Sequence, residues 1–517
     1  MSQHETGVGP EGGPDPTLED PAMRALADGP GAPVRARHPK GLGVLFVTEM
    51  WERFSYYGMR ALLVLYLIAS TSDALENGQP NPNPGFGWSE ESAFILYGIY
   101  TWAVYLTPIF GGWLADRFLG THRSMLIGGW IIVAGHVTLA LTELFGVTAG
   151  EAVTLQTGPG ALVTFITGLV LIVIGTGFFK PCVSVMVGQL YAEGDPRRDS
   201  GFTIFYMGIN LGALMSPLVA GTLGEVVGWH WGFGATAVGM FAGLVCYKLL
   251  RPRYLPGIGL APRAQAAWDA ANAAEEQGAQ AAAPEPPPRV VWQRIAVILI
   301  LAFVGNIFFW TAFEQAGSSL NVFAKNATDR TLGGLFGGDG FPASWYQSVN
   351  PLAILIFAPV LAWLWVFLER RRLNPSTPAK FFWGLFLLGL AFIAMVLGAI
   401  QARDGGLAGP HWLLITYVVY TWGELCLSPV GLSMVTKLAP LRLQSLMMGL
   451  WFFSFSLANL LGGLVARFSK RLEAGEVTFV LEGLPGFYLM LVMFPMAAGA
   501  LILLLTPLLK RMMHGVK

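Results

Sequence analysis

Long apolar stretches separated by short polar connections recur along nearly the whole chain. A helix needs about twenty mainly apolar residues to cross the roughly 30 Å hydrocarbon core of a bilayer. Twelve stretches approach or exceed this length, at 42–69, 91–115, 124–145, 160–189, 202–224, 231–250, 292–316, 349–369, 381–401, 411–436, 446–466 and 486–509. The pattern predicts six transmembrane helices, a break, and six more.

Polar segments at both ends and in the middle divide the chain into five parts. Residues 1–41 are rich in Gly and Pro and lack the short apolar stretch of a secretory signal, so we expect a disordered cytoplasmic tail. Residues 251–290 are rich in Ala, Glu and Pro and too polar to span, so we expect a partly helical cytoplasmic linker. Six-helix bundles are then expected at 42–250 and 291–510, with a short cytoplasmic tail at 511–517.

Composition and charge support a membrane protein and suggest its orientation. Charged residues make up 12% of the chain, against about a quarter in soluble proteins, and the mean hydropathy is +0.55. Lys and Arg concentrate in the even-numbered connections, and cationic loops stay cytoplasmic. We therefore expect a multi-pass protein of the cell (inner) membrane with both termini inside. The three cysteines fall in different spans, which argues against a disulfide framework.

The first predicted span contains four ionisable residues, Glu49, Glu52, Arg53 and Arg60. Such residues are costly inside a membrane and mark function. Glu49, Arg53, Tyr57 and Arg60 follow one another at steps of four, four and three, so they share one helix face. A purely structural interpretation, in which the charges neutralise one another at the membrane surface, fits poorly because Arg60 lies too deep.

Further charges occur singly in other spans. Lys180 follows a long apolar run, so its ammonium needs an anion nearby. Glu314 and Glu424 lie in the seventh and tenth spans without a cation one turn away. Cations thus concentrate in the first half and unmatched carboxylates in the second, an arrangement that would hold a zwitterion between them. A buried carboxylate that loses its cationic partner can take up a proton, so proton coupling would need no cofactor.

Aromatic and neutral polar side chains within or at the spans are further candidates for a pocket. Each aromatic residue taken alone is more often a packing or interfacial residue. The candidates are Tyr56, Tyr57, Tyr105, Trp310 and Trp451, together with Asn210, Asn350 and Ser428.

Several motifs resemble those of a known transporter family. The segment Glu49–Gly58, EMWERFSYYG, is similar to the ExxERFxYYG signature of the proton-dependent oligopeptide transporter (POT) family of the major facilitator superfamily. Phe205–Leu214 resembles the family's FYxxINxGxL pattern, and Gly111–Gly120 resembles the superfamily's loop motif. The resemblance implies an all-α fold of two six-helix bundles and a symporter that imports di- and tripeptides with protons by alternating access. We expect a monomer, although the sequence itself carries no signal for the oligomeric state.

The resemblance also implies roles for individual residues. Arg60 and Lys180 would lie near the peptide carboxylate, and Glu424 would receive the amino terminus. Arg60–Glu314 and Lys180–Glu424 would form salt bridges when the outer gate closes, while Glu49, Glu52, Arg53 and Glu314 would couple the proton. The implied peptide-binding residues are Arg53, Tyr56, Tyr57, Arg60, Tyr105, Lys180, Asn210, Trp310, Glu314, Asn350, Glu424, Ser428 and Trp451.

Other functions receive less support from the sequence. A carrier of another small anionic or zwitterionic solute stays open, although a nitrate carrier would need a titratable His in a cationic pocket, and the one His in a span, His136, is more often structural. HExxH, GxSxG and Gly-rich phosphate motifs are missing, so we expect no enzyme, no metal site and no nucleic acid partner. A channel or nutrient receptor would be distinguished by uptake that fails to concentrate its substrate.

Overall fold

The computed structural model describes most of the chain between Arg37 and Val516. The described residues are 37–71, 75–76, 79–145, 147–149, 152–154, 159–192, 195, 197–261, 287–337, 340–403, 406–440 and 443–516. Nearly all of the predicted N-terminal tail and most of the predicted linker therefore lie outside the described residues.

Six long helices form the first half of the protein. They are α2 (Lys40–Ile68), α3 (Glu90–Leu114), α4 (Thr121–Ala140), α5 (Pro159–Gln189), α6 (Arg198–Ser216) and α7 (Trp229–Tyr254). Short helical turns extend α3 over Ala115–Leu119, α4 over Thr142–Phe145, and α6 over Pro217–Gly221 and Leu223–Val227.

The second half begins with a broken helix and continues with five long ones. The first span of this half comprises α9 (Pro288–Ile300), a turn at Leu301–Asn306, α10 (Ile307–Phe313), a 3-10 turn at Glu314–Gly317, and α11 (Ser319–Asn326). A 3-10 turn at Ala343–Ser348 leads into α12 (Val349–Arg370). The remaining helices are α13 (Thr377–Gln401), α14 (Pro410–Leu438), α15 (Gln444–Glu473) and α16 (Gly483–Met512).

Local sequence explains several of the helix starts. The Ser89 hydroxyl accepts the amide of Ser92 and so caps α3. Helices α9 and α14 begin with Pro288 and Pro410, because the first helical position needs no amide donor.

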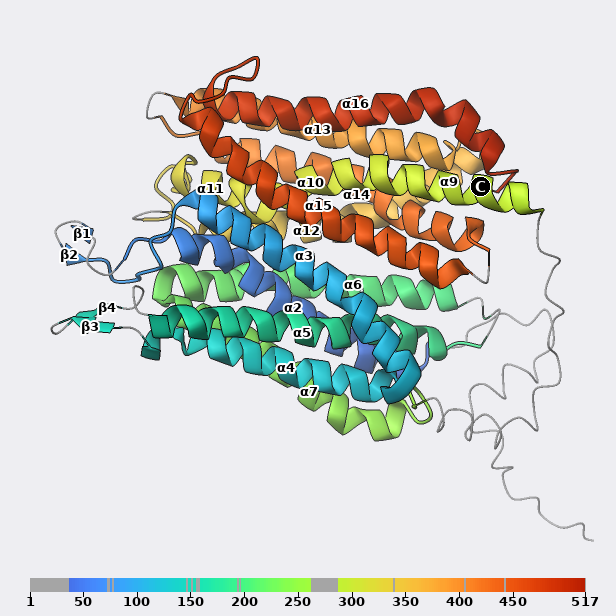
Figure 1. The fold of residues 1–517 in the computed structure, drawn as a ribbon, viewed down its shortest axis with the longest axis horizontal. Coiled ribbons are helices and arrows are strands. Elements are labelled where there is room, and N and C mark those ends of the chain that lie inside the picture. Colours follow the sequence, from blue (N-terminus) through green and yellow to red (C-terminus); the bar gives the residue numbers. More distant parts are fainter. Residues whose placement is uncertain are drawn as a thin grey trace, which may run out of the picture.

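Two short antiparallel hairpins, which the sequence did not lead us to expect, lie at one end of the molecule (Figure 1). They pair β1 (Leu75–Glu76) with β2 (Gln79–Pro80), and β3 (Val147–Ala149) with β4 (Ala152–Thr154). We call this the hairpin end. The opposite end, where α2 begins, α7 ends, α9 begins and α16 ends, is called the linker end.

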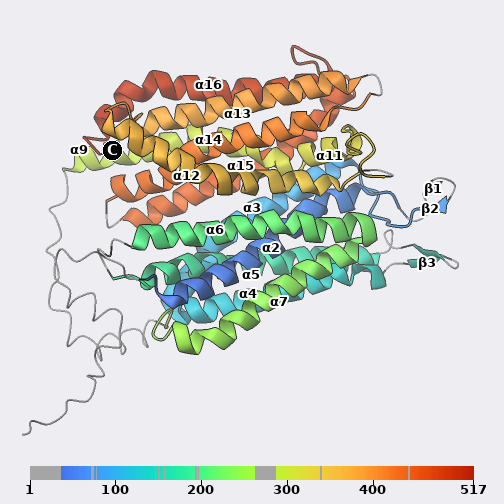
Figure 2. The same ribbon diagram turned by 180° about the vertical axis from the view of Figure 1, so that it is seen from behind.

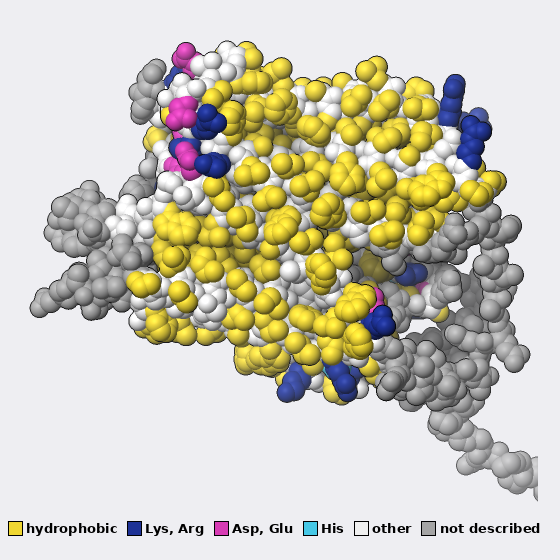
Figure 3. Space-filling model, viewed as in Figure 1, with side chains coloured by type: hydrophobic (Ala, Val, Ile, Leu, Met, Phe, Trp, Pro, Cys, Tyr) yellow, Lys and Arg dark blue, Asp and Glu magenta, His cyan; other side chains and the backbone are white. Residues whose placement is uncertain are grey.

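The helices have the length and surface of a membrane-spanning bundle. In the described part of the chain, eleven helical segments are long and apolar enough to cross a bilayer. Helix α2 is missing from that set because of its charges, but it has 29 residues and runs between α6 and α7 (Figure 2), so it is the twelfth. Apolar side chains cover the face shown in Figure 3, with Lys and Arg toward its ends. The predicted all-α fold of twelve transmembrane helices is confirmed.

The two halves lie side by side and touch one another toward the hairpin end. The Glu225 carboxylate accepts the amides of Ala343 and Ser344 at 2.9 and 3.0 Å. Helices α3 and α15 approach so closely that a Cβ on Gly98 would lie 2.9 Å from the Cα of Gly463. Toward the linker end the surface between the halves is hollowed (Figure 3). The protein is therefore closed at its hairpin end.

Candidate substrate and proton site

The charged cluster predicted in the first span forms within α2. The Arg53 Nε donates a hydrogen bond to Glu49 Oε1 at 2.8 Å and lies 2.7 Å from Glu52 Oε2. All three residues are buried: Glu49 is 4% exposed, Glu52 1% and Arg53 5%. One guanidinium thus faces two carboxylates, and the Lys180 ammonium lies within electrostatic range of both.

Lys180 lies over an aromatic ring and within electrostatic range of Glu52, Glu49 and Glu314. Its Nζ lies 3.5 Å from the centroid of the Tyr105 ring, close enough for a cation–π interaction. The ion pairs found among the described residues do not include Lys180, so the predicted pair with Glu424 is not formed in this conformation. The physical reason is the crossing of α5 and α3, which presents a ring face to the ammonium.

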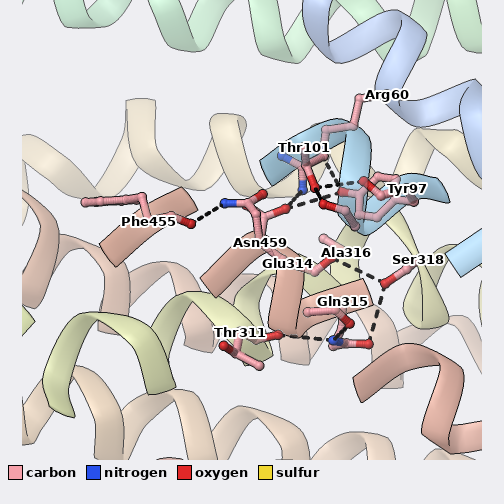
Figure 4. A network of polar contacts seen from close by, with 12 residues as sticks. Arg60, Tyr97, Thr101, Thr311, Glu314, Gln315, Ala316, Ser318, Phe455 and Asn459 are labelled. Carbon is pink, nitrogen blue, oxygen red and sulfur yellow. Dashed lines mark hydrogen bonds and ion pairs between the residues drawn. The ribbon is translucent and has the colours of Figure 1, made fainter. Parts of the chain in front are cut away.

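The predicted pair of Arg60 and Glu314 is present and joins the two halves (Figure 4). Arg60 Nη2 lies 2.6 Å from Glu314 Oε2, and Arg60 Nε donates to the Tyr97 hydroxyl at 2.7 Å. That hydroxyl in turn donates to Glu314 Oε2 at 3.3 Å. The three side chains form a buried triangle, which we call the Arg60 triad, between α2, α3 and the turn after α10.

Gln315 holds the turn that presents Glu314 (Figure 4). Its side-chain amide donates to the carbonyls of Thr311 and Gly462 at 3.1 and 3.0 Å, and its oxygen accepts from the Ser319 hydroxyl at 2.7 Å. These bonds tie the 3-10 turn to α10 and α15. The turn begins with Glu314, so both helices help to fix the position of this residue.

Tyr97 is the one member of the Arg60 triad that the sequence analysis missed. It is fully buried, and it lies eight residues before Tyr105 on the same helix. Residues 97, 101 and 105 follow one another at steps of four, which places them on one face. That spacing was the available signal, but Tyr97 carries no charge and belongs to none of the motifs.

Removing the Tyr97 hydroxyl should lower the folding stability of the protein, because this hydroxyl links Arg60 of the first half to Glu314 of the second. Tyr97→Phe leaves the Nε of buried Arg60 without its partner, so we expect a loss of about 1–3 kcal/mol of folding stability. Thermal unfolding of the detergent-purified protein would measure it. Tyr100→Phe is the matched control, because Tyr100 is also buried on α3 but its hydroxyl has no partner among the described residues. Equal effects of both variants would contradict the proposed bridging role.

Glu424 on α14 has a different environment. The Asn350 amide donates to Glu424 Oε2 at 2.9 Å and to the Thr421 hydroxyl at 2.9 Å. Glu424 is 7% exposed, and none of the ion pairs found among the described residues includes it. A buried carboxylate with a neutral donor alone has acceptor capacity left for an ammonium group.

Tyr56 and Tyr57, two of the predicted pocket residues, lie near the arginines of the same helix. Tyr56 and Tyr57 have the guanidiniums of Arg53 and Arg60 at 5.7 and 5.9 Å from their ring centroids. The Tyr57 hydroxyl also lies within electrostatic range of Glu314 and Glu424. The first-half cations and the second-half carboxylates therefore surround one central position.

Four predicted residues remain, and three of them make local contacts. The Trp310 indole donates to Asn306 Oδ1 at 2.8 Å. The Asn210 amide donates to the carbonyl of Tyr206 at 2.9 Å on its own helix. Trp451 is fully buried and packs against Phe381, so in this conformation it belongs to the core of the second half. Ser428 is partly exposed on α14. Their contacts with substrate stay predictions.

Comparisons with known proteins agree with this arrangement. The model of the POT family matches residues 122–255 and 290–480. The peptide transporter YePEPT of Yersinia enterocolitica subsp. palearctica is 35% identical, covering 96% of this chain and 99% of that protein. A di-/tripeptide transporter of Lactococcus lactis subsp. cremoris is 35% identical, and the match covers 85% of this chain and 91% of that protein. The crystal structure of a peptide transporter POT in complex with sulfate superposes with a TM-score of 0.75 and is 35% identical. The match covers 96% of this chain and 100% of that chain.

The family match spans more than half of the chain, and the relatives align over most of their own length. The solved structure shares the fold of this chain over nearly its whole length. This chain is therefore a membrane transporter that belongs to the POT family.

Proposed function

We propose that this protein imports di- and tripeptides together with protons. The observation that carries the proposal is the opposition of buried charges across the two halves. Arg60 and Lys180 come from the first half, whereas Glu424 of the second half is bound by the neutral Asn350. A short peptide with a carboxylate at one end and an ammonium at the other fits between them, and both relatives compared above are named peptide transporters.

Two buried carboxylate groupings support proton coupling. Glu49 and Glu52 share Arg53, and Glu314 is held by Arg60 and Tyr97. A peptide carboxylate that binds Arg60 competes with Glu314, and the freed buried carboxylate then favours its protonated form. Each charge moved inward across about 100 mV releases roughly 2.3 kcal/mol. The proton is the coupling ion, and the cycle uses no other cofactor.

The closed hairpin end supports a cycle of alternating access. We assign the linker end, with both termini, to the cytoplasm and the hairpin end to the outside, in keeping with the basic connections at the linker end. The bundles at 42–250 and 291–510 rock about the central site, and the linker between them connects the halves on the cytoplasmic side. The transporter acts as a monomer in the inner membrane.

Uptake of labelled dialanine into liposomes containing the purified protein tests this function. A pH jump should drive accumulation above the outside concentration, and a protonophore should collapse it. Folded protein without peptide flux would exclude peptides and leave another small anionic or zwitterionic solute. Uptake that equilibrates without concentrating would exclude coupling.

The Glu225 carboxylate of the first half accepts the amides that begin the 3-10 turn Ala343–Ser348 of the second half. These two hydrogen bonds should stabilise closure of the hairpin end. Glu225→Ala removes both amide acceptors, so we expect the cleft between the halves to open more often. In a cysteine-free background, Ser348→Cys would report this, since Ser348 is 5% exposed and bonds to the Leu214 carbonyl of the other half. We expect modification by an impermeant maleimide to accelerate about tenfold, which corresponds to about 1.4 kcal/mol.

Glu143→Ala is the matched control for that experiment. Glu143 pairs with His230 at 2.6 Å near the hairpin end, but both residues belong to the first half. Its removal should therefore leave the modification rate unchanged. Equal acceleration in both variants would show general loosening instead of opening.

A further inference from the structure

A groove lies outside the central site, at the linker end of the first half. Helices α6 and α7 both pack on α2 and separate toward this end, so that the first turns of α2 lie between them (Figure 2). The groove has a volume of about 630 Å³, and all of its lining residues come from α2, α6, α7 and the two residues before α2. It therefore belongs to one half and takes no part in the opposition of charges across the two halves.

The wall of the groove is mainly apolar. Leu42 and Val44 are buried at its floor, Phe46 and Ile204 are partly exposed, and Leu250 is 37% exposed. In a bundle that spans a membrane, such a groove is filled by hydrocarbon, since water gains nothing from apolar walls. The shape and chemistry suit an acyl chain running along α6 and α7.

The rim of the groove is cationic. Lys40 lines it, and Arg253 lies beside it with its guanidinium 5.5 Å from the ring centroid of Tyr254, another lining residue. Both cations are exposed, and no ion pair with a carboxylate of the described residues involves either of them. Among the described residues, no Asp or Glu lines the groove.

Two neighbouring polar groups are already engaged and do not neutralise the rim. Arg197 Nη2 lies 2.7 Å from Asp195 Oδ2, and this bond lowers the pKa of the Asp195 carboxyl. His38 shares a hydrogen bond of 2.9 Å with the Tyr191 hydroxyl. In the described part of the chain, Lys40 and Arg253 are therefore two exposed cations at the rim that form no ion pair.

We propose that this groove binds an anionic phospholipid. The phosphate lies between Lys40 and Arg253, and one acyl chain follows Phe46, Ile204 and Leu250. Basic pockets between helices at a membrane surface are suited to phosphate headgroups, whose charge is complementary to the rim. The site is independent of the transported substrate, so it stands or falls separately from peptide transport.

Native mass spectrometry of the purified full-length protein tests the site with two lipids of identical acyl chains. Phosphatidylglycerol should be retained and phosphatidylcholine lost at the same concentration. Lys40→Gln and Arg253→Gln should each weaken phosphatidylglycerol binding about fivefold, and both together about 25-fold.

A glycine in the groove allows a blocking variant with a matched control. No atom lies within 4 Å of a Cβ built on Gly43, which lines the groove, so a side chain can start there, and Gly43→Phe is designed to place its ring in the groove. Gly234 on α7 has the same free space but lies outside the groove. Gly43→Phe should reduce phosphatidylglycerol binding at least tenfold, whereas Gly234→Phe should leave it unchanged.

Four results would overturn the proposal. Equal retention of both lipids would indicate unspecific solvation of the apolar surface. Unchanged binding in the Lys40, Arg253 and Gly43 variants would place the lipid elsewhere. Full displacement by glycerol 3-phosphate at the lipid's own concentration would indicate a site for a free anion. Binding that occurs only after deletion of residues 1–36 would show that this chain's own segment occupies the groove.

Discussion

Replacing Glu52 with Gln is expected to abolish accumulation of peptide against its gradient while leaving exchange of labelled for unlabelled peptide intact. Glu52 is 1% exposed and shares the Arg53 guanidinium with Glu49. The neutral amide imitates a permanently protonated carboxylate, so the carrier can still move when loaded but cannot release its proton. A potential of about 100 mV supports accumulation of roughly 50-fold per charge, and in the variant this ratio should fall to one.

The measurement is uptake and counterflow in the same batch of liposomes, with a membrane potential and pH gradient applied only for uptake. Glu49→Gln is the informative comparison, because Glu49, unlike Glu52, accepts a well-directed hydrogen bond from Arg53 Nε. We expect it to retain part of the accumulation. Concentrative uptake by Glu52→Gln at the normal level would remove Glu52 from the coupling scheme.

The arrangement of the spans could be predicted from the sequence because bilayer thickness fixes the length of an apolar helix. The stretch predicted at 160–189 is observed as Pro159–Gln189, and the one at 349–369 as Val349–Arg370. The grouping of Glu49, Arg53 and Arg60 on one face could also be predicted, since it depends only on the helical repeat. Such features are properties of a single helix.

Features that depend on how helices cross were not predictable in the same way. Tyr97 reaches Arg60 and Glu314 because α3, α2 and the turn after α10 meet at one point. Lys180 lies over the Tyr105 ring and forms no ion pair with Glu424, because of the relative orientation of α5 and α3. A sequence pattern carries the period of each helix but no information on the rotation of one helix against another.

The broken seventh span and the small hairpins show a second limit. Glu314 opens a 3-10 turn that Gln315 ties to α15, and this break lies within a stretch that reads as one apolar helix. The strands β1–β4 are two or three residues long and lie in polar connections without an alternating pattern. Segments this short are determined by their surroundings more than by their own residues.

Replacing Glu424 with Gln is expected to weaken peptides with a free amino terminus far more than N-acetylated ones. The Glu424 carboxylate has the Asn350 amide as its hydrogen-bond donor, and no ion pair found in the described part of the chain involves it. An incoming ammonium would therefore supply the missing charge. Losing one partner of a buried charge pair costs at least about 2 kcal/mol, or about 30-fold in affinity. Glutamine keeps the shape and still accepts from Asn350, so the pocket should stay intact.

Competition against labelled dialanine in liposomes would measure this, with dialanine and its N-acetylated form as competitors for the wild type and the variant. The ratio of the two affinities isolates the contribution of the amino terminus, because changes in folding or in the gate affect both competitors alike. Glu314→Gln is the comparison, since Glu314 already has a cationic partner in Arg60. We expect it to lower both affinities by a similar factor. If Glu424→Gln also lowered both equally, Glu424 would have a structural role, and the amino terminus would have to bind elsewhere in the central site.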